Sequence, residues 1–364
     1  MTVKSTSRAR IAIVGGGIAG LACAFELSRR GLVPTVIEAG RAGEGALWAS
    51  GGMLAAAFES AESDASPDMA ALARRGLELW RDWSELLEQD AIGYRSAGSV
   101  SPASGAAGRA WLERLSATAS RLGFRADPVT PPTGIKADAA LRFPEDGELD
   151  NRLLGQRLVS ALRAAGVKVH ENRAVTAIEE MTGSGVELTC GADKMRFDAA
   201  VLSTGHDTRL ATVDPACNAI LPVRGEMLSV GAQGLTLPGC IRAQAVYLSQ
   251  KPDRRIVIGA TSEAGSSDLA VDSDAISILR DRAVALFPGL AGAPEVERWA
   301  GIRPGTRDGH PILGESSTPG VFLALGLYRN GVLFSPAVAE VLADAVLGGR
   351  PVAASFSARR FDER

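Results

Sequence analysis

Three glycines near the start of the chain have the spacing of a nucleotide-binding turn. Gly15, Gly17 and Gly20 form the pattern G-x-G-x-x-G within IAIVGGGIAG. Gly15 permits a tight turn, Gly17 lets the backbone approach a pyrophosphate, and Gly20 lets a helix pack closely on a strand. Glu38 follows where a carboxylate can accept hydrogen bonds from the ribose hydroxyls of an adenosine, and where it would repel the 2′-phosphate of NADP. These residues predict dinucleotide binding, and they favour NAD or FAD.

The residues around the glycines predict the elements that must position them. Residues 11–14 are apolar and rich in β-branched side chains, residues 21–27 carry apolar side chains at helical spacing, and residues 35–37 form a second short strand before Glu38. In the order strand, turn, helix and strand, the helix N-terminus offers free N–H groups to the phosphates. The alternative is a glycine-rich turn in some other βαβ unit.

Size, charge and cysteine usage favour a cytoplasmic enzyme. The 364 residues are enough for about two domains, and the net charge of −3 provides no basic field, so we expect no nucleic-acid partner. The four cysteines lack any C-x-x-C spacing and are typical of buried thiols in a reducing compartment. The sequence contains no uninterrupted run of about 18 apolar residues, so we expect no membrane-spanning helix. We also expect a homo-oligomer that binds no membrane.

The chain after Glu38 alternates between helical and strand patterns. Residues 39–52 form a glycine-rich loop placed to wrap the rest of a dinucleotide, and residues 69–88 have the period of an amphipathic helix with Trp80 and Trp83 in the core. Residues 197–203 predict a buried strand, and Gly205 just after it can lie against a ligand. Near the end of the chain, we expect a helix from Pro336 to Leu347 that the proline opens.

Six stretches that span most of the chain carry a family resemblance. The chain resembles the FAD-dependent amino-acid oxidases of the D-amino-acid oxidase superfamily, and within it most closely the glycine oxidases. The last two stretches are the most specific. The six are VGGGIAG with Glu38, GGML followed by Glu59, LPVRGEMLSV (221–230), VYLSQKPDRRIVIGAT (246–261), WAGIRPGTRDGHPILG (299–314) and ALGLYRNGVLFSP (324–336).

The resemblance implies FAD as the cofactor. The fingerprint residues would hold the pyrophosphate, Glu38 the ribose, Val175 the adenine, residues 51–53 the flavin side and residues 327–333 the flavin's pyrimidine edge. No metal is expected. The expected cofactor-binding residues are Gly15, Gly17, Ile18, Ala19, Gly20, Glu38, Ala39, Ala46, Leu47, Gly51, Gly52, Met53, Val175, Gly205, Leu327, Tyr328, Asn330, Gly331, Val332 and Leu333.

The resemblance also implies the residues that face the substrate. Arg303 and Arg329 match positions that bind the substrate carboxylate, a role suited to the planar guanidinium fork. Tyr247 matches a tyrosine that closes the site. Each of the three could instead be an ordinary ion-paired or core residue.

The implied activity is oxidation of glycine or a small N-substituted glycine at its Cα. A hydride would pass to flavin N5, the imine would give glyoxylate and an amine, and O₂ would give H₂O₂. Sarcosine or a small D-amino acid are further substrates that fit. The alternatives are a dehydrogenase that uses an acceptor other than O₂, and a flavoprotein in which FAD is structural.

The expected fold class is α/β, with a Rossmann-type FAD-binding domain and a second, mostly antiparallel β substrate domain. The FAD-binding domain is expected to be discontinuous and to comprise residues 1–85, 150–217 and 296–364. The substrate domain is expected to comprise residues 86–149 and 218–295.

Overall fold

The computed structural model describes residues 9–362 with the exception of residues 183 and 233. Contacts between Cα atoms divide the chain into two compact units. The first comprises Met1–Trp48, Arg152–Val223 and Ile302–Arg364, and the second comprises Ala49–Asn151 and Arg224–Gly301. Residues 49–85, expected with the nucleotide-binding segments, fall in the second unit because their strand pairs there with residues 147–148.

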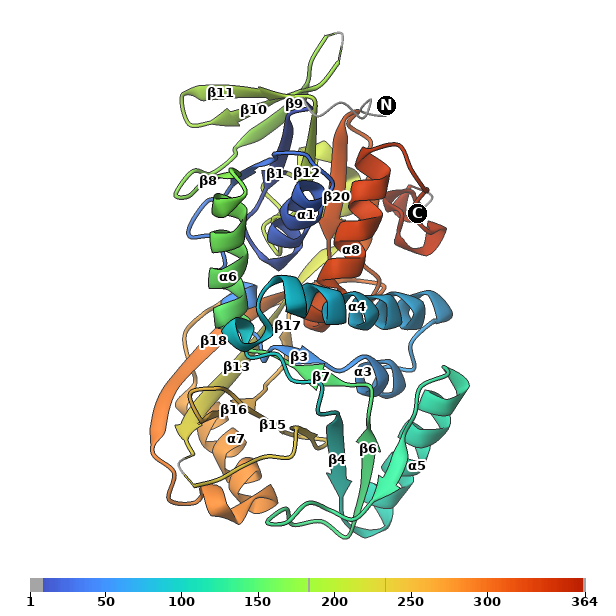
Figure 1. Ribbon diagram of the computed structural model, residues 1–364, viewed down its shortest axis with the longest axis vertical. Helices are drawn as coiled ribbons and strands as arrows, with labels where there is room; N and C mark the ends of the chain where they lie inside the picture. The colour runs from blue at the N-terminus through green and yellow to red at the C-terminus, as the bar shows by residue number, and fades with distance from the viewer. Residues whose placement is uncertain (1–8, 183, 233, 363–364) are drawn as a thin grey trace. The chain divides into compact units, whose positions relative to one another are not determined.

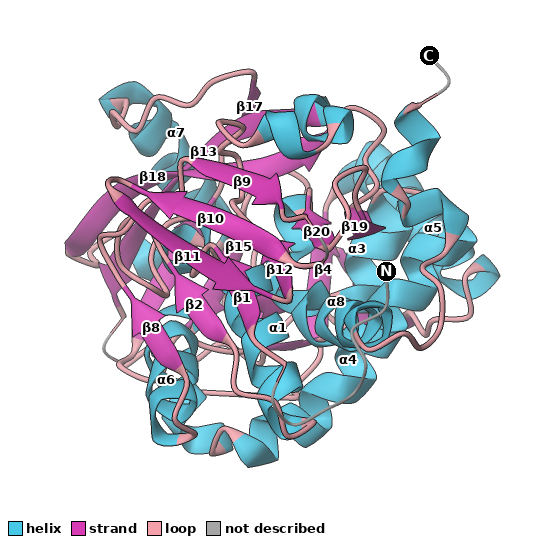
Figure 2. Ribbon diagram, turned by 90° about the horizontal axis from the view of Figure 1, so that it is seen from above, coloured by secondary structure: helices cyan, strands magenta, loops and turns pink. Residues whose placement is uncertain are grey.

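The first unit is built on a six-stranded sheet with the order β19-β20-β12-β1-β2-β8. Five of these strands are parallel and β19 is antiparallel. Figure 2 shows β8, β2, β1 and β12 following one another across this sheet. Their bounds are β1 Ile11–Val14, β2 Thr35–Ile37, β8 Lys168–His170, β12 Ala199–Leu202, β19 Ile312–Glu315 and β20 Val321–Leu325.

The parallel strands are buried because helices and loops cover the sheet. All four residues of β1 and of β12 are buried, as an apolar run in a parallel sheet predicts. Helices α1 and α8 pack against each other beside it, as Figure 1 shows. The helices of this unit are α1 Ile18–Arg29, α2 Ala46–Ala49, α6 Asn151–Ala164 and α8 Gly331–Val346. Helices α2 and α6 each extend into the second unit by one residue. The unit also contains the short 3₁₀ turns η2 Ala211–Val213, η3 Pro215–Ala219, η5 Tyr328–Asn330, η6 Ala354–Phe356 and η7 Ala358–Phe361.

A small antiparallel sheet adjoins the same core and has the order β11-β10-β9. Leu188 of β10 is fully buried in the core cluster that also holds Ala200 and Leu323 of the large sheet. The parallel sheet flanked by helices confirms the predicted α/β class. The strands of the small sheet are β9 Ala177–Glu180, β10 Val186–Cys190 and β11 Asp193–Phe197.

Helix α8 begins five residues earlier than predicted, so the expectation that Pro336 opens it is wrong. Pro336 lies inside the helix and has no N–H to donate to the carbonyl of Val332 four residues before it. The buried hydroxyl of Ser335 donates to that carbonyl at 2.9 Å instead. The serine therefore replaces the hydrogen bond that the proline removes, and the helix continues.

The second unit contains a mostly antiparallel sheet with the order β17-β13-β16-β15-β14-β4-β6-β5, with β18 paired to β13. The pair β14 and β4 is parallel. The largely antiparallel pairing confirms the prediction of a second, mostly antiparallel β fold. Residues 220–223 of β13 and 302–306 of β18 belong to the first unit. The strands of this sheet are β4 Ser99–Ala103, β5 Asp127–Val129, β6 Ala139–Phe143, β13 Ile220–Gly231, β14 Cys240–Arg242, β15 Tyr247–Gln250, β16 Arg255–Gly259, β17 Glu263–Ala264 and β18 Glu295–Thr306, and a separate pair is formed by β3 Met53–Leu54 and β7 Gly147–Glu148.

The helix predicted near residues 69–88 is α4, which spans Pro67–Leu86. Ser66 caps it by accepting a hydrogen bond from Met69 N at 3.3 Å, and Pro67 takes the first helical position, which suits proline. Trp80 and Trp83 are buried and meet edge to face at 5.9 Å, which confirms their core role. The other helical segments of this unit are α3 Ala56–Glu62, η1 Gln89–Ile92, α5 Gly105–Arg121, α7 Ser273–Leu286 and η4 Pro288–Leu290.

Candidate cofactor and substrate site

The nucleotide turn of the first unit needs glycine at two of its three fingerprint positions. Gly15 has φ +110°, and its N–H donates to Ile37 O at 2.9 Å, so the turn is held against β2. A Cβ added at Gly20 would collide with the carbonyl of Gly15 and lie 2.6 Å from Ser203 Oγ. Gly20 therefore permits the close packing of α1 on the turn.

Gly17 differs from the other two glycines because the space that a side chain would enter there is open. A Cβ at Gly17 would meet no atom within 4 Å. Gly17 is the N-cap of α1, it provides no side-chain cap, and the first turn holds no acidic residue. Free amide groups at a helix N-terminus, with open space before them, form an anion-binding site. The turn fits a pyrophosphate at this point.

Glu38 is fixed beside the same turn. One carboxylate oxygen accepts from Gly16 N at 2.5 Å and the other from Gly40 N at 2.7 Å. A carboxylate offers about four acceptor sites, so two backbone donors leave room for ribose hydroxyls. Ala39 next to it is exposed, and the N–H of Arg173 donates to Glu38 O at 2.8 Å. Val175, two residues further on, is partly buried and packs against the core cluster that contains Ile37 of β2.

The glycine-rich loop after Glu38 returns to the nucleotide turn. Gly43 N donates to Gly16 O at 2.8 Å. Leu47 is buried, and its side chain lies 3.4 Å from the Cβ position of Gly155 on α6, whereas Ala46 is exposed. The loop is therefore ordered, and the Leu47 side chain packs against a helix.

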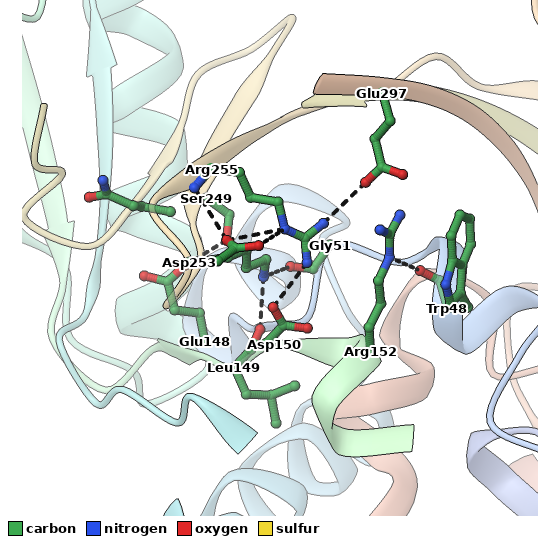
Figure 3. A network of polar contacts seen from close by, with 12 residues as sticks. Trp48, Gly51, Glu148, Leu149, Asp150, Arg152, Ser249, Asp253, Arg255 and Glu297 are labelled. Carbon is green, nitrogen blue, oxygen red and sulfur yellow. Dashed lines mark hydrogen bonds and ion pairs between the residues drawn. The ribbon is translucent and has the colours of Figure 1, made fainter. Parts of the chain in front are cut away.

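An arginine of α6 holds the end of this loop. The guanidinium of Arg152 lies 3.7 Å from the ring centroid of Trp48, and Arg152 Nε donates to Trp48 O at 3.4 Å. Figure 3 shows this pair. The contact combines a cation–π interaction with a hydrogen bond, so it fixes the short helix α2 that contains Ala46 and Leu47.

A second helix N-terminus lies beside the first. A Cβ at Gly331, the first residue of α8, would be 3.4 Å from Ile18 Cγ2 at the start of α1. Val332 and Leu333 are buried, Leu327 precedes the 3₁₀ turn η5, and Asn330 is its last residue. The structure thus brings the predicted residues 327–333 next to the predicted pyrophosphate turn, and two positive helix ends face one region.

The two predicted carboxylate-binding arginines lie on adjoining segments of the first unit. Arg303 is on β18 and is partly buried, and Arg329 is in η5 and is exposed. A Cβ at Gly305 would be 3.5 Å from the ring of Tyr328, so the strand of Arg303 contacts the turn of Arg329. Gly205, also predicted as a ligand contact, has φ +64°, and a Cβ there would meet no atom within 4 Å.

In the second unit the structure brings Tyr247 onto the predicted flavin-side turn. A Cβ at Gly51 would lie 2.9 Å from the Tyr247 hydroxyl and 3.2 Å from Met53 Cε. The hydroxyl donates to Met227 Sδ at 3.0 Å. Tyr247, Gly51 and Met53 thus form one group, although they are far apart in sequence. Met227, which the sequence analysis did not single out, completes it.

A buried arginine that the sequence analysis missed lies close to this group. Arg242 forms an ion pair with Glu59, donates to Met53 Sδ at 2.6 Å, and lies 4.4 Å from the ring centroid of Phe58 and 5.6 Å from that of Tyr247. Glu59 and Met53 accept its two hydrogen bonds and lie 183 and 189 residues away in sequence. No local sequence pattern could therefore have revealed these contacts.

Burial shifts the pKa of several groups in the two units. Burial raises the pKa of Asp146 to about 7, against the opposing effects of hydrogen bonds from Ser99, Ala57 N and Phe58 N and of the nearby Arg242 charge. Burial also raises the pKa of the Cys23 thiol to about 12 and that of Cys217 to about 11. All four cysteines are free and buried, as predicted, and these two thiols stay protonated at neutral pH, so they are poor nucleophiles.

Two features are absent from the described residues. Within the described part of the chain, no group of three or more His, Cys, Asp or Glu residues is arranged to hold a metal ion. Of the helices in residues 9–362, none is both long and apolar enough to cross a bilayer.

A family profile, a sequence relative and a solved structure each match most of the chain. A family profile described as "FAD dependent oxidoreductase" matches residues 10–345. Glycine oxidase of Geobacillus kaustophilus is 31% identical over 354 residues, which cover 94% of this chain and 93% of that protein. The crystal structure of glycine oxidase from that organism superposes with a TM-score of 0.87 and covers 97% of this chain and 99% of its own.

Longer relatives contain a further part that this chain does not match. The "Bifunctional protein ThiO/ThiG" of Synechocystis sp. is 30% identical over 371 residues, which cover 96% of this chain and 54% of that protein. The chain therefore spans about half the length of these bifunctional relatives.

Proposed function

The chain belongs to the family of FAD dependent oxidoreductases, and from this membership we propose that it oxidises glycine or a small N-substituted glycine. The observation that carries the proposal is the packing of Tyr247 over Gly51. This contact joins the tyrosine expected to close a substrate site to the turn expected to meet the flavin. The similarity to glycine oxidases along nearly the whole chain supports the same substrate class.

The first unit holds the cofactor in this proposal. The α1 N-terminus binds the pyrophosphate in the open space before Gly17, and Glu38 accepts hydrogen bonds from the ribose. The N-terminus of α8, which begins beside Ile18, presents positive potential to a developing negative charge. Bound FAD supplies the two-electron acceptor that amino-acid side chains lack.

Arg303 and Arg329 bind the substrate carboxylate. A guanidinium stays charged and can engage both carboxylate oxygens, so it fixes the orientation of a small substrate that offers few other contacts. Positive charge near the substrate nitrogen also lowers the pKa of its ammonium group and favours the neutral amine that oxidation requires.

Tyr247 is held in a way that allows it to change partner. Its hydroxyl donates to the thioether of Met227 at 3.0 Å, and a thioether is a weak acceptor. Exchange of this bond for a bond to a substrate carboxylate therefore costs little free energy. The backbone at Gly51 and Gly259 approaches the phenol so closely that a Cβ at either position would lie within 3 Å of it.

The finer parts of the proposal concern the acceptor and the setting. We infer that O₂ is the electron acceptor and that H₂O₂, glyoxylate and an amine are the products. We also infer that the chain works in the cytoplasm as a homo-oligomer without a membrane partner. The buried free thiols support a reducing compartment.

The test is an anaerobic reduction of the purified holoprotein. Glycine or sarcosine is added without oxygen, and the flavin absorbance at about 450 nm is followed. Bleaching, followed by recovery and peroxide release when air is admitted, is the expected result. Bleaching without peroxide would assign the chain to the dehydrogenases, and no bleaching by any small amino acid would leave FAD as a structural group and contradict the proposal.

A further inference from the structure

Lys251 is a buried lysine at the end of β15, in the hairpin that leads into β16. Its exposed fraction is 3%. Its ammonium group donates to Gly51 O at 2.7 Å and to Leu149 O at 2.8 Å. Both acceptors are main-chain carbonyls, and one of them belongs to the turn that we assign to the flavin. Figure 3 shows Gly51 and Leu149 close to the charged side chains of Asp150 and Arg255.

The carboxylates nearby are engaged by other groups. Glu148 accepts from Arg95 at 2.5 Å and from Ser249 at 2.6 Å, and Asp150 accepts from Arg255 at 3.0 Å. Glu148 and Asp150 counteract the desolvation that lowers the pKa of Lys251, but the hydrogen bonds of its ammonium go to backbone. A buried cation is costly unless it is paired and hydrogen-bonded. Here its hydrogen bonds hold a turn in place.

Hydrogen bonds from Lys251 and from Leu149 N set how two peptide groups of the turn are oriented. Gly52 has φ +66°, and its carbonyl accepts from Leu149 N at 2.8 Å. Lys251 fixes the carbonyl of Gly51 in the same way. In a trans peptide the N–H points opposite to the C=O, so the N–H groups of Gly52 and Met53 are directed to the opposite side of the turn.

The space around the ammonium is closely fitted. A Cβ at Gly52 would lie 3.1 Å from Lys251 Nζ, so a larger head group in place of the ammonium would push against the turn. On another side, Gly51 is covered by the Tyr247 hydroxyl. The turn is thus held between the lysine and the tyrosine.

We propose that Lys251 is a positioning residue whose buried amino group orients the Gly51–Gly52 turn for the flavin and thereby sets how tightly the chain holds FAD. The proposal rests on the proposed function in so far as it takes this turn as the flavin-side contact. It assigns a cofactor-affinity role to a residue in a hairpin whose own side chain need not touch the cofactor.

The test measures FAD affinity of the apoprotein in three variants at Lys251. Lys251→Met removes both donors and the charge, and we expect the FAD dissociation constant to rise by about 10- to 100-fold, because buried acceptors that lose their donors are costly. Lys251→Gln keeps polar hydrogens without the charge. Lys251→Arg keeps the charge but has a larger head group. The FAD dissociation constants of Lys251→Gln and Lys251→Arg should therefore lie between those of Lys251→Met and wild type. Affinity is followed by the quenching of flavin fluorescence on binding.

A matched control lies three residues away in the same hairpin. The side chain of Arg254 is exposed and donates to Leu235 O at 3.3 Å, so Arg254→Met removes a cation without touching the turn and should bind FAD like wild type. The thermal midpoint of each apoprotein is recorded beside its affinity. A general loss of stability would lower the thermal midpoint of the Lys251 variants but would not give the expected order of FAD affinities.

Two outcomes would overturn the inference. The first is a Lys251→Met apoprotein that folds and binds FAD within about twofold of wild type. If that variant does not fold, an unchanged FAD affinity of Lys251→Gln decides against the inference in the same way. Failure of the proposed function is distinct, because a wild-type holoprotein that binds FAD but is bleached by no amino acid would leave the affinity comparison intact.

Discussion

Arg329 provides the most direct test of the proposed substrate contact. The residue is exposed in the short turn before α8, and a carboxylate bound there would gain both charge and a planar pair of donors. Arg329→Ala should raise the KM for glycine by roughly 10- to 100-fold, as expected for a lost hydrogen bond between charged groups, and Arg329→Lys should raise it less. Steady-state peroxide assays check this.

The control for Arg329 is Arg307, an exposed arginine in the loop after β18. Arg307→Ala should leave the KM unchanged. If both Arg329 variants also leave it unchanged, Arg329 is an ordinary surface residue.

Asp146 should make stability depend on pH. Its pKa is raised to about 7 in the folded protein from an ordinary value of 3.8, so between these values the folded state binds more protons than the unfolded state. Stability from this group is present at low pH and is lost as pH rises through about 7. The Tm of wild type relative to Asp146→Asn should therefore fall between about pH 4.5 and pH 8.

The exposed Asp90 gives the control for this profile. Asp90→Asn removes a carboxylate from the surface, so its Tm profile shows what the loss of one exposed negative charge does by itself. Parallel Tm profiles for wild type and Asp146→Asn would show that Asp146 does not carry a raised pKa.

The start of helix α1 separates folding from cofactor binding. A Cβ at Gly17 enters open space, and Gly17 has φ −77°, which alanine accepts, whereas a Cβ at Gly20 meets the Gly15 carbonyl. Gly17→Ala should leave the apoprotein Tm unchanged but weaken FAD binding, because its methyl group occupies the approach of the pyrophosphate. Gly20→Ala should lower the apoprotein Tm, since such overpacking costs about 1–3 kcal/mol.

Differential scanning calorimetry of the apoproteins and fluorescence titration with FAD measure the two effects. Unchanged FAD affinity of Gly17→Ala would place the pyrophosphate away from the α1 N-terminus.

Local patterns predicted the elements well and the contacts between distant segments poorly. The glycine spacing predicted β1, α1 and β2 because each depends on neighbours within about ten residues. The predicted start of α8 was wrong because the Ser335 hydroxyl replaces the hydrogen bond that Pro336 cannot make. The preference of proline for the first helical position does not anticipate this replacement. Arg242 and Lys251 were missed because their partners are 100 to 200 residues away in sequence. A lysine in a hairpin normally points to water.

At the scale of the whole molecule, FAD should stabilise the fold and NADP⁺ should not. A ligand at 100 times its dissociation constant stabilises a protein by about 2.7 kcal/mol, which should raise Tm by several degrees. ADP should give a smaller rise, because it offers only the pyrophosphate and adenosine groups to the first unit. NADP⁺ should give none, since Glu38 repels its 2′-phosphate.

Thermal melts of the apoprotein with each nucleotide test this order. A rise with NADP⁺ equal to that with FAD would contradict the assignment of Glu38 to the ribose.

The strand order of the first unit governs how the chain can fold during synthesis. β1 lies between β2 and β12, but β12 begins only at Ala199. At about 5–20 residues per second, one edge of β1 stays without its partner for roughly 10 to 40 s after the strand leaves the ribosome. During that time an apolar strand with unpaired N–H and C=O groups can pair with other nascent chains. Slower growth at low temperature, or more chaperone, should therefore raise the soluble yield more than added FAD does, because the cofactor can bind only after the sheet has closed.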